Sequence, residues 1–383
     1  MPTNLETTRL LRDLVSIPSV NPMGRDLKGP EIYEHRVSAY LRDFFQGLGV
    51  PFEVQPVAPL RENVVARWDA PGGRRTLVFE AHQDTVPTDN MNIDPFAATI
   101  RDGKRYGRGA CDIKGGMAAM LAAFARLVRE RPSGAANVIM ACSVDEEFTS
   151  LGVHRLVEDL RADAAVVAEP TELNIVNTHK GIVRWHMHTP GRSCHSSQPE
   201  KGVNAVYRMA RLVRGIERYA ERLRAAQTHP VLGPATVSVG IIAGGTSVNT
   251  VPESCRIEMD RRLLPGEDPQ AAIDDLVQFL KADPDIDFPF RCDPPWMSKR
   301  ALSPDQSAEL VAGLGQVIDT VRGSHQVVGV PYGTDGSSIS ESGIPTVVFG
   351  PGDIARAHTA DEWVPLDEVD QASEILYRFA CAG

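Results

Sequence analysis

Five short runs of apolar residues constrain the fold of this chain more than any other feature of its sequence. The runs cover residues 64–68, 76–79, 138–142, 164–168 and 346–349. A continuous apolar run of this length is typical of a strand that is buried on both faces, as in a parallel sheet. Segments with apolar residues at helical spacing, such as residues 33–48 before the first run and 117–127 between the second and third, alternate with the strand-like runs. Strands that alternate with helices predict an α/β fold with a mostly parallel central sheet.

The middle of the chain follows a different pattern. Residues 182–189 alternate like a half-exposed strand, and the next segments predict a helix, two strands, a helix and a last strand, near 203–226, 236–242, 255–263, 270–280 and 288–292. This βαββαβ order is that of a ferredoxin-like α+β domain. A chain of 383 residues is also longer than one hydrophobic core usually supports. We therefore expect one domain made of residues 1–178 and 296–383, with a second domain, 179–295, inserted in it.

Composition and charge exclude several classes of protein. The formal net charge is −10 and no cluster of Lys and Arg offers a phosphate-binding surface, so nucleic acid is not an expected partner. The six cysteines contain no CxxC pair, which argues against a disulfide framework or a zinc ribbon. Residues 1–15 contain interspersed charges and no apolar core of a signal peptide, and no stretch of the chain approaches the roughly 20 apolar residues of a membrane span. These features predict a cytoplasmic protein without a membrane partner.

Metal-binding residue types stand just after the predicted strands, where α/β sheets build their sites. His82 and Asp84 are two residues apart, so one side chain can bind a metal while the other orients the imidazole. Asp112 lies in GRGACDIKGG, whose glycines let the backbone turn tightly around one carboxylate. A surface-loop histidine and a glycine-rich turn with a solvated acid are the structural alternatives. A phosphate loop is disfavoured, because the glycines lack the P-loop or GxGxxG spacing.

Three further segments supply acids and a histidine. SVDEEF follows the run at 138–142, and its three adjacent acids would raise one another's pKa in the absence of a cation. One of Glu146 and Glu147 can bind a metal while the other acts as general base. An acidic helix N-terminus, which the helix dipole favours, explains this segment equally well. Glu169 follows the run at 164–168, and His358 follows a Gly-Pro-Gly turn. Together, two histidines and three carboxylates suit two divalent ions that share one bridging carboxylate.

The order and spacing of these motifs resemble the M20 metallopeptidase family, the group of acetylornithine deacetylases, succinyl-diaminopimelate desuccinylases, aminoacylases and carboxypeptidases G. The resemblance spans nearly the whole chain. It implies a catalytic α/β domain in which Asp112 bridges two metal ions, Zn²⁺ first, with Co²⁺ or Mn²⁺ as alternatives. His82 and Glu169 would complete one metal site. Glu147 and His358 would complete the other.

The resemblance also implies roles for residues around these ligands. Glu146 would be the general base that takes a proton from a water between the two ions, and Asp84 would orient His82. In the family the peptide bond after the bridging acid is commonly cis. We therefore expect a cis bond between Asp112 and Ile113.

In the middle domain the resemblance rests on GRSCHSSQPEKGVNA, GGTSVNTVPESC and DRRLLPG. It implies that this domain serves as a lid and forms a homodimer, and that His195 reaches across the dimer interface to stabilise the oxyanion. Asn249 and Arg262 match positions that bind the substrate carboxylate. Asp335, in YGTDGSS, is expected either to meet a substrate cation or to cap the helix that begins near Ser337.

The motifs CDIKG and GPGDIARAH look most like the acetylornithine deacetylase group. We therefore predict an amide hydrolase that removes a small N-acyl group, acetyl first, from an amino acid. The alternatives are a desuccinylase-like deacylase, a dipeptidase or carboxypeptidase of the same family, and a metal-binding scaffold protein without catalysis. The scaffold interpretation predicts the loss of Glu146 or His195, and both are present.

Overall fold

The computed structural model describes residues 5–226 and 228–383, which form two compact units. The first unit runs through Asn177 and then takes up Pro304–Val328 and Thr334–Gly383. The second unit consists of Thr178–Ser303 and Gly329–Gly333. Its main segment ends later than residue 295, the end of the expected insertion, because strand β13 (Met297–Lys299) pairs with β9 (Gly181–Pro190) of the same unit.

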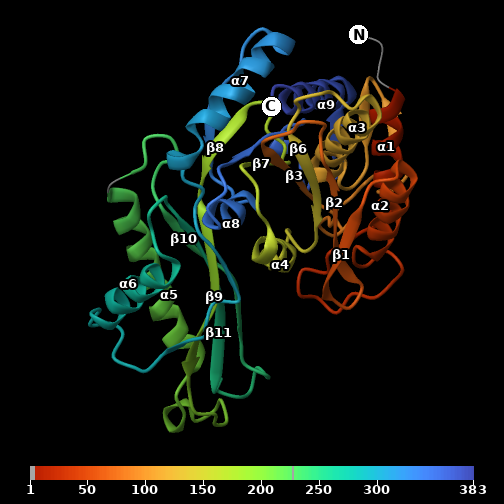
Figure 1. The fold of residues 1–383 in the computed structure, drawn as a ribbon. Helices are drawn as coiled ribbons and strands as arrows, with labels where there is room; N and C mark the ends of the chain where they lie inside the picture. Colours follow the sequence, from red (N-terminus) through yellow and green to blue (C-terminus); the bar gives the residue numbers. More distant parts are fainter. Residues whose placement is uncertain (1–4, 227) are drawn as a thin grey trace. The chain divides into compact units, whose positions relative to one another are not determined.

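An eight-stranded sheet forms the centre of the first unit, in the order β1-β2-β6-β3-β7-β15-β8-β14 (Figure 1). Its middle strands are parallel, and each contains one of the predicted apolar runs: β6 (Asn137–Ser143), β3 (Thr76–His82), β7 (Ala164–Val167) and β15 (Thr346–Val348). Towards the other edge follow β8 (Ile175–His179), antiparallel to β15, and β14 (Val327–Val330). The predicted α/β class with a mostly parallel central sheet is confirmed.

The fifth apolar run corrects one detail of this prediction. It lies in β2 (Arg61–Trp68), which is antiparallel both to β6 and to β1 (Phe52–Ala58). β1 and β2 are joined by a tight turn, so they run in opposite directions. A continuous apolar run indicates that both faces of a strand are buried, and residues 63–66 of β2 are indeed buried. The run carries no information about whether the strand is parallel or antiparallel to its neighbours.

Helices cover both faces of this sheet (Figure 1). On one side lie α1 (Leu5–Ser16), α2 (His35–Leu48), α3 (Gly115–Glu130), α7 (Ala308–Arg322) and α9 (Leu366–Cys381), and on the other α4 (Leu151–Asp159) and α8 (Gly336–Glu341). α3 is buried almost all round because it packs on α1, α9 and the sheet, and its first turns are rich in Ala and Met. Within the described residues, no helix is long and apolar enough to cross a bilayer.

A small three-stranded sheet joins distant parts of the first unit. It contains β4 (Thr99–Arg101), β5 (Lys104–Tyr106) and β16 (Trp363–Pro365), in the order β16-β5-β4. Trp363 pairs with Tyr106, so the segment that follows His358 lies beside the segment that leads into the glycine-rich turn.

The second unit has the predicted βαββαβ order. Its antiparallel sheet runs β10 (Thr236–Gly244), β11 (Ser254–Leu263), β9 and β12 (Arg291–Cys292), with β13 also paired to β9. Burial alternates along β9, and its buried side chains pack with those of α5 (Ala205–Ala225) and α6 (Pro269–Lys281). One face of the sheet therefore forms a core with the two helices, and the other is left to polar and charged residues.

Candidate metal centre

The five predicted ligands converge at one edge of the central sheet. His82 is the last residue of β3, and Glu147 and Glu169 follow β6 and β7. Because these strands are parallel, their carboxyl ends meet at the same edge. Ligand atoms of His82, Asp112 and Glu169 lie within 4.8 Å of one another. Those of Asp112, Glu147 and His358 do so as well, and Asp112 therefore belongs to both groups.

The glycine-rich segment forms a buried turn, Ala110–Lys114, directly before α3. The peptide bond between Asp112 and Ile113 is cis, as expected. Gly115 closes the turn at a point where an added Cβ would lie 2.8 Å from the carbonyl oxygen of Ala110, so a larger residue would push the two segments apart. The carboxylate of Asp112 lies 3.2 Å from Nε2 of His82 and 3.3 Å from Nε2 of His358.

The sequence did not single out Glu362, which holds this turn in place. Its Oε1 accepts hydrogen bonds from the backbone N–H groups of Cys111 and Asp112, both at 3.0 Å. Its Oε2 accepts a hydrogen bond of 2.7 Å from Nη1 of Arg108, and both side chains are buried. The available signal was its place in AHTADE, four residues after His358 and directly before β16.

Removal of the Glu362 charge is expected to destabilise the protein strongly. Glu362→Gln leaves the buried guanidinium of Arg108 without its counter-ion, which costs about 3–5 kcal/mol of unfolding free energy. Glu374→Gln, which removes a more exposed partner of Arg126 and Arg378, should cost less than about 1 kcal/mol. Urea unfolding of both variants in EDTA, so that metal binding does not contribute, measures the difference. Equal losses in the two variants would contradict this ranking.

Asp84 links His82 to the acidic loop after β6. Nδ1 of His82 lies 3.0 Å from the backbone carbonyl oxygen of Asp84 and 3.5 Å from Oδ1 of the Asp84 carboxylate. The carboxylate also accepts the backbone N–H groups of Glu146, at 3.1 Å, and Glu147, at 3.2 Å. Burial alone would raise the pKa of Asp84, but its interactions with His82, Arg61 and Asn21 lower it to about 2. Asp84 is thus a charged anchor for two neighbouring segments of the site.

The electrostatics of the cluster fit a bound cation. Burial, and then the charge of Asp112, raise the pKa of Glu147 to about 7 and that of Glu169 well above its ordinary value. Burial would lower the pKa of His358, but Asp112 and Glu147 raise it to about 11. Without a cation, the buried carboxyl groups of Glu147 and Glu169 thus resist ionisation beside Asp112, and a bound divalent ion relieves this condition. Imidazole and carboxylate groups are suitable ligands for zinc, cobalt or manganese.

The proposed general base lies beside these ligands without belonging to either group. Glu146 is half-buried in the loop after β6, next to Glu147, and its backbone N–H donates a hydrogen bond to Asp84. Of these two neighbours, Glu147 belongs to one of the ligand groups found among the described residues and Glu146 does not.

Asp335, one of the four residues predicted to contact substrate, lies in the first unit. It is buried and accepts a hydrogen bond of 3.2 Å from the hydroxyl of Ser143. It precedes α8, but its side chain does not cap that helix, so the capping alternative was wrong. The same Ser143 hydroxyl bonds Glu80, whose pKa burial and the charge of Asp335 raise to about 8.

The other three predicted substrate residues lie in the second unit. His195 is exposed, and its Nδ1 lies 2.7 Å from the hydroxyl of Ser197. The carbonyl of Asn249 accepts the N–H of Ser196, so the loops that carry His195 and Asn249 are joined. Arg262 is half-buried in β11 and donates a hydrogen bond to Asp260.

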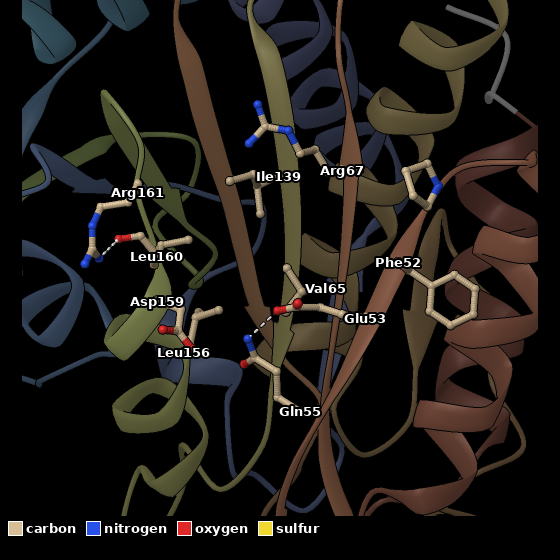
Figure 2. A pocket seen from close by; sticks show the side chains of 11 residues that line it. Phe52, Glu53, Gln55, Val65, Arg67, Ile139, Leu156, Asp159, Leu160 and Arg161 are labelled. Carbon is tan, nitrogen blue, oxygen red and sulfur yellow. Dashed lines mark hydrogen bonds between the residues drawn. The ribbon is translucent and has the colours of Figure 1, made fainter.

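A separate pocket of about 410 Å³ lies along β1, β2, β6 and α4 (Figure 2). Its lining combines apolar side chains such as Val65, Ile139 and Leu156 with charged ones such as Arg67 and Asp159. None of the predicted site residues lines it. The candidate site is therefore defined by its convergent ligands and not by this pocket.

A doubly covered α/β sheet with two adjoining ligand groups at its strand ends is the arrangement of a metal-dependent hydrolase. Residues 78–382 match the model of peptidase family M20/M25/M40. The chain belongs to the M20 peptidase family, and it is a hydrolase of the metallopeptidase and deacylase type.

Individual relatives agree with this placement. The acetylornithine deacetylase of Proteus mirabilis is 30% identical over 98% of this chain and 95% of that protein. The acetylornithine deacetylase of Myxococcus xanthus is 31% identical over 82% of each. Among solved structures, the metallo-carboxypeptidase Sso-CP2 of Sulfolobus solfataricus superposes with a TM-score of 0.79 at 19% identity, over 98% of both chains. The YXEP protein of Bacillus subtilis, a dinuclear metal binding peptidase, has a TM-score of 0.68 at 17% identity, over 99% of this chain and 97% of its own. These structural likenesses show the shared fold.

Proposed function

We propose that this protein is a two-metal deacylase that hydrolyses a small N-acyl group, acetyl first, from an amino acid. One observation carries the proposal: two groups of potential metal ligands share the buried Asp112, and Glu146 adjoins them without being a member of either. The acetyl preference is supported by the relatives named acetylornithine deacetylase, which match almost the full length of the chain.

In this proposal His82, Asp112 and Glu169 hold one divalent ion, and Asp112, Glu147 and His358 hold the other. Zn²⁺ is the first choice, with Co²⁺ or Mn²⁺ as alternatives. When bound, two such ions supply a Lewis acid for the amide carbonyl and lower the pKa of water at the site. The fit rests on the donor types and on the crowding of buried carboxyl groups, which raises the pKa of Glu169.

The protein's own groups carry the proton. Glu146 takes a proton from the attacking water at its carboxylate and returns it to the amine nitrogen as the C–N bond breaks, so the products are a carboxylic acid and an amino acid. The carboxylate of Asp84 keeps Glu146 in place by accepting a hydrogen bond from the backbone N–H of Glu146. Asn249 and Arg262 are proposed to bind the substrate carboxylate, and His195 to donate a hydrogen bond to the developing oxyanion.

A comparison of substrates tests the acyl preference. N-acetylornithine, N-acetylcitrulline, N-succinyl-diaminopimelate and a simple dipeptide are assayed side by side with metal-loaded protein. We expect kcat/KM for one of the acetylated amino acids to exceed that for the succinylated compound and the dipeptide by at least about tenfold. A preference for the dipeptide would favour a family dipeptidase, and no hydrolysis of any of the four would refute the deacylase proposal.

A homodimer through the second unit is part of the proposal, because β10 presents an open edge. β10 is the terminal strand of its sheet, and Ile241 and Ile242 on it are 54% and 57% exposed. Tyr207 and Val248 are also exposed apolar residues of this unit. An uncovered strand edge with apolar side chains is a surface suited to pairing with a second copy.

His195→Ala is expected to lower kcat by about 10²-fold while both metals are retained, because the imidazole is assigned to the oxyanion and not to a metal. If His195 acts across a dimer, mixing inactive His195→Ala and Glu146→Gln proteins should restore part of the activity, since a mixed dimer contains one complete site. Size-exclusion chromatography with light scattering confirms that mixed dimers form. Mixed dimers without activity would show that His195 does not act across the interface.

A further inference from the structure

A buried network of charged side chains lies behind the acidic loop. Arg61, at the start of β2, donates from Nε to Oε2 of Glu34 at 2.9 Å, and its Nη2 bonds the other oxygen of the same carboxylate. Its Nη1 donates to Oδ1 of Asp145 at 2.6 Å. Glu34 and Asp145 are fully buried and the side chain of Arg61 is 8% exposed. One guanidinium thus joins two carboxylates, each in a position that water does not reach.

Asp145 organises the loop that it begins. Its backbone has a φ of +68°, which is uncommon for a residue with a side chain. Its carboxylate bonds the hydroxyl of Thr149 and the Nδ2 of Asn21, and its carbonyl accepts the N–H of Ser150 at 2.6 Å. The residue is therefore fixed by its contacts with Arg61, Asn21 and the rest of the loop.

The two residues that follow Asp145 are Glu146 and Glu147. Their N–H groups are held by the carboxylate of Asp84, and Asn21 donates from one Nδ2 both to Asp84, at 2.8 Å, and to Asp145, at 2.9 Å. The Glu146–Glu147 dipeptide is thus anchored on its backbone by Asp84 and, one residue earlier, by the Arg61 network.

We propose that Arg61 is a positioning residue for the reaction: by clamping Asp145 to Glu34, it sets the place of Glu146 and of the ligand Glu147. This inference rests on the roles proposed above for these two glutamates. Arg61 touches neither substrate nor metal in this assignment. The requirement is for arginine, because its planar fork bonds Glu34 with two nitrogens while the third reaches Asp145, which the single ammonium of lysine does not reproduce.

The test compares substitutions at two arginines of the same strand. Arg61→Lys removes the planar guanidinium but keeps the positive charge, and Arg61→Met removes both. Arg67→Lys and Arg67→Met are the matched controls, because Arg67 is also in β2 but its side chain is 48% exposed and pairs with Asp69 at the surface. For each protein, kcat and KM are measured per metal-loaded site, Co²⁺ binding is measured by calorimetric titration, and Tm by thermal unfolding.

We expect kcat to fall about tenfold in Arg61→Lys and about 10²-fold in Arg61→Met, with KM within about twofold of the parent, because a small displacement of the base misplaces the proton transfer. Of the two Co²⁺ sites, only one should weaken, by about tenfold or more, because the clamp supports Glu147 but not Glu169. The Arg67 variants should match the parent in all of these quantities. Arg61→Lys keeps the buried charge, so it remains informative if Arg61→Met does not fold.

Two results would overturn the inference. In the first, Arg61→Lys has the same kcat per metal-loaded site and the same two Co²⁺ affinities as the parent, and only its Tm is lower. Arg61 would then have a purely structural role. The other is a rise in KM alone. If the parent protein itself hydrolyses no amide, the proposed function fails, and the Co²⁺ titration still decides whether Arg61 positions the Glu147 ligand.

Discussion

Glu146→Gln should lower kcat by about 10³-fold or more and leave both metal ions bound. Glutamine has nearly the same shape as glutamate but cannot accept the proton of the attacking water, and general acid–base catalysis contributes up to about 10⁴-fold. Metal content should not change, because Glu146 belongs to neither ligand group. The measurements are steady-state kinetics on the preferred acetylated amino acid and metal analysis of the same sample.

Glu158→Gln is the matched control for this experiment. Glu158 lies on the exposed surface of α4, just beyond the acidic loop, and pairs with Arg155. Its substitution should leave kcat unchanged. A Glu146→Gln protein that kept most of the parent activity would refute the assignment of the general base, whereas loss of metal would transfer Glu146 to the ligand set.

Asp112→Asn should abolish activity by removing both metal ions at once. The carboxylate of Asp112 is common to the two ligand groups, and an amide bridges two cations poorly because it is neutral. Glu169→Gln and Glu147→Gln, which each alter one group only, should weaken one ion and spare the other. Metal analysis after dialysis against a weak chelator gives the number of ions retained by each variant.

Asp43→Asn, on the exposed surface of α2, controls for the loss of one negative charge and should retain the parent metal content. The shared ligand predicts a clear order: the parent and the control hold two ions, the single-group variants hold one firmly, and Asp112→Asn holds none. If Asp112→Asn still held two ions, the carboxylate would not be a bridge.

The clustering of the predicted ligands could be foreseen because these residues follow segments with a strong strand signal. His82, Glu147 and Glu169 lie at or within a few residues of the carboxyl ends of three parallel strands, and the carboxyl ends of such strands meet. The direction of β2 was not predictable, because burial on both faces is the same for parallel and antiparallel strands. The order of elements in the second unit followed from alternation and helical spacing, which local sequence does report.

The residues that hold the candidate site in place could not be predicted from the sequence, for a different reason. Glu362 and Arg61 are buried charges, and charged side chains are so rarely buried that the sequence favours an exposed position for each of them. What identifies them is a partner distant in the chain, Arg108 for Glu362 and Glu34 with Asp145 for Arg61. Asp335 illustrates the same limit, since its bond to Ser143 and its failure to cap α8 depend on tertiary packing.

The inserted second unit has a consequence for the order in which the site matures during synthesis. His82, Asp112 and Glu169 are all translated before the insertion, whereas His358, and the Glu362 that holds the backbone of Asp112, are translated after it. β15, which lies between β7 and β8, is also the last strand of the eight-stranded sheet to be synthesised. A ribosome-bound chain therefore carries the groups for one ion long before it can complete the second site. In the proposed assignment, the two-ion centre is complete only after the segment that carries His358 and Glu362 has been synthesised and has folded onto the first part of the chain.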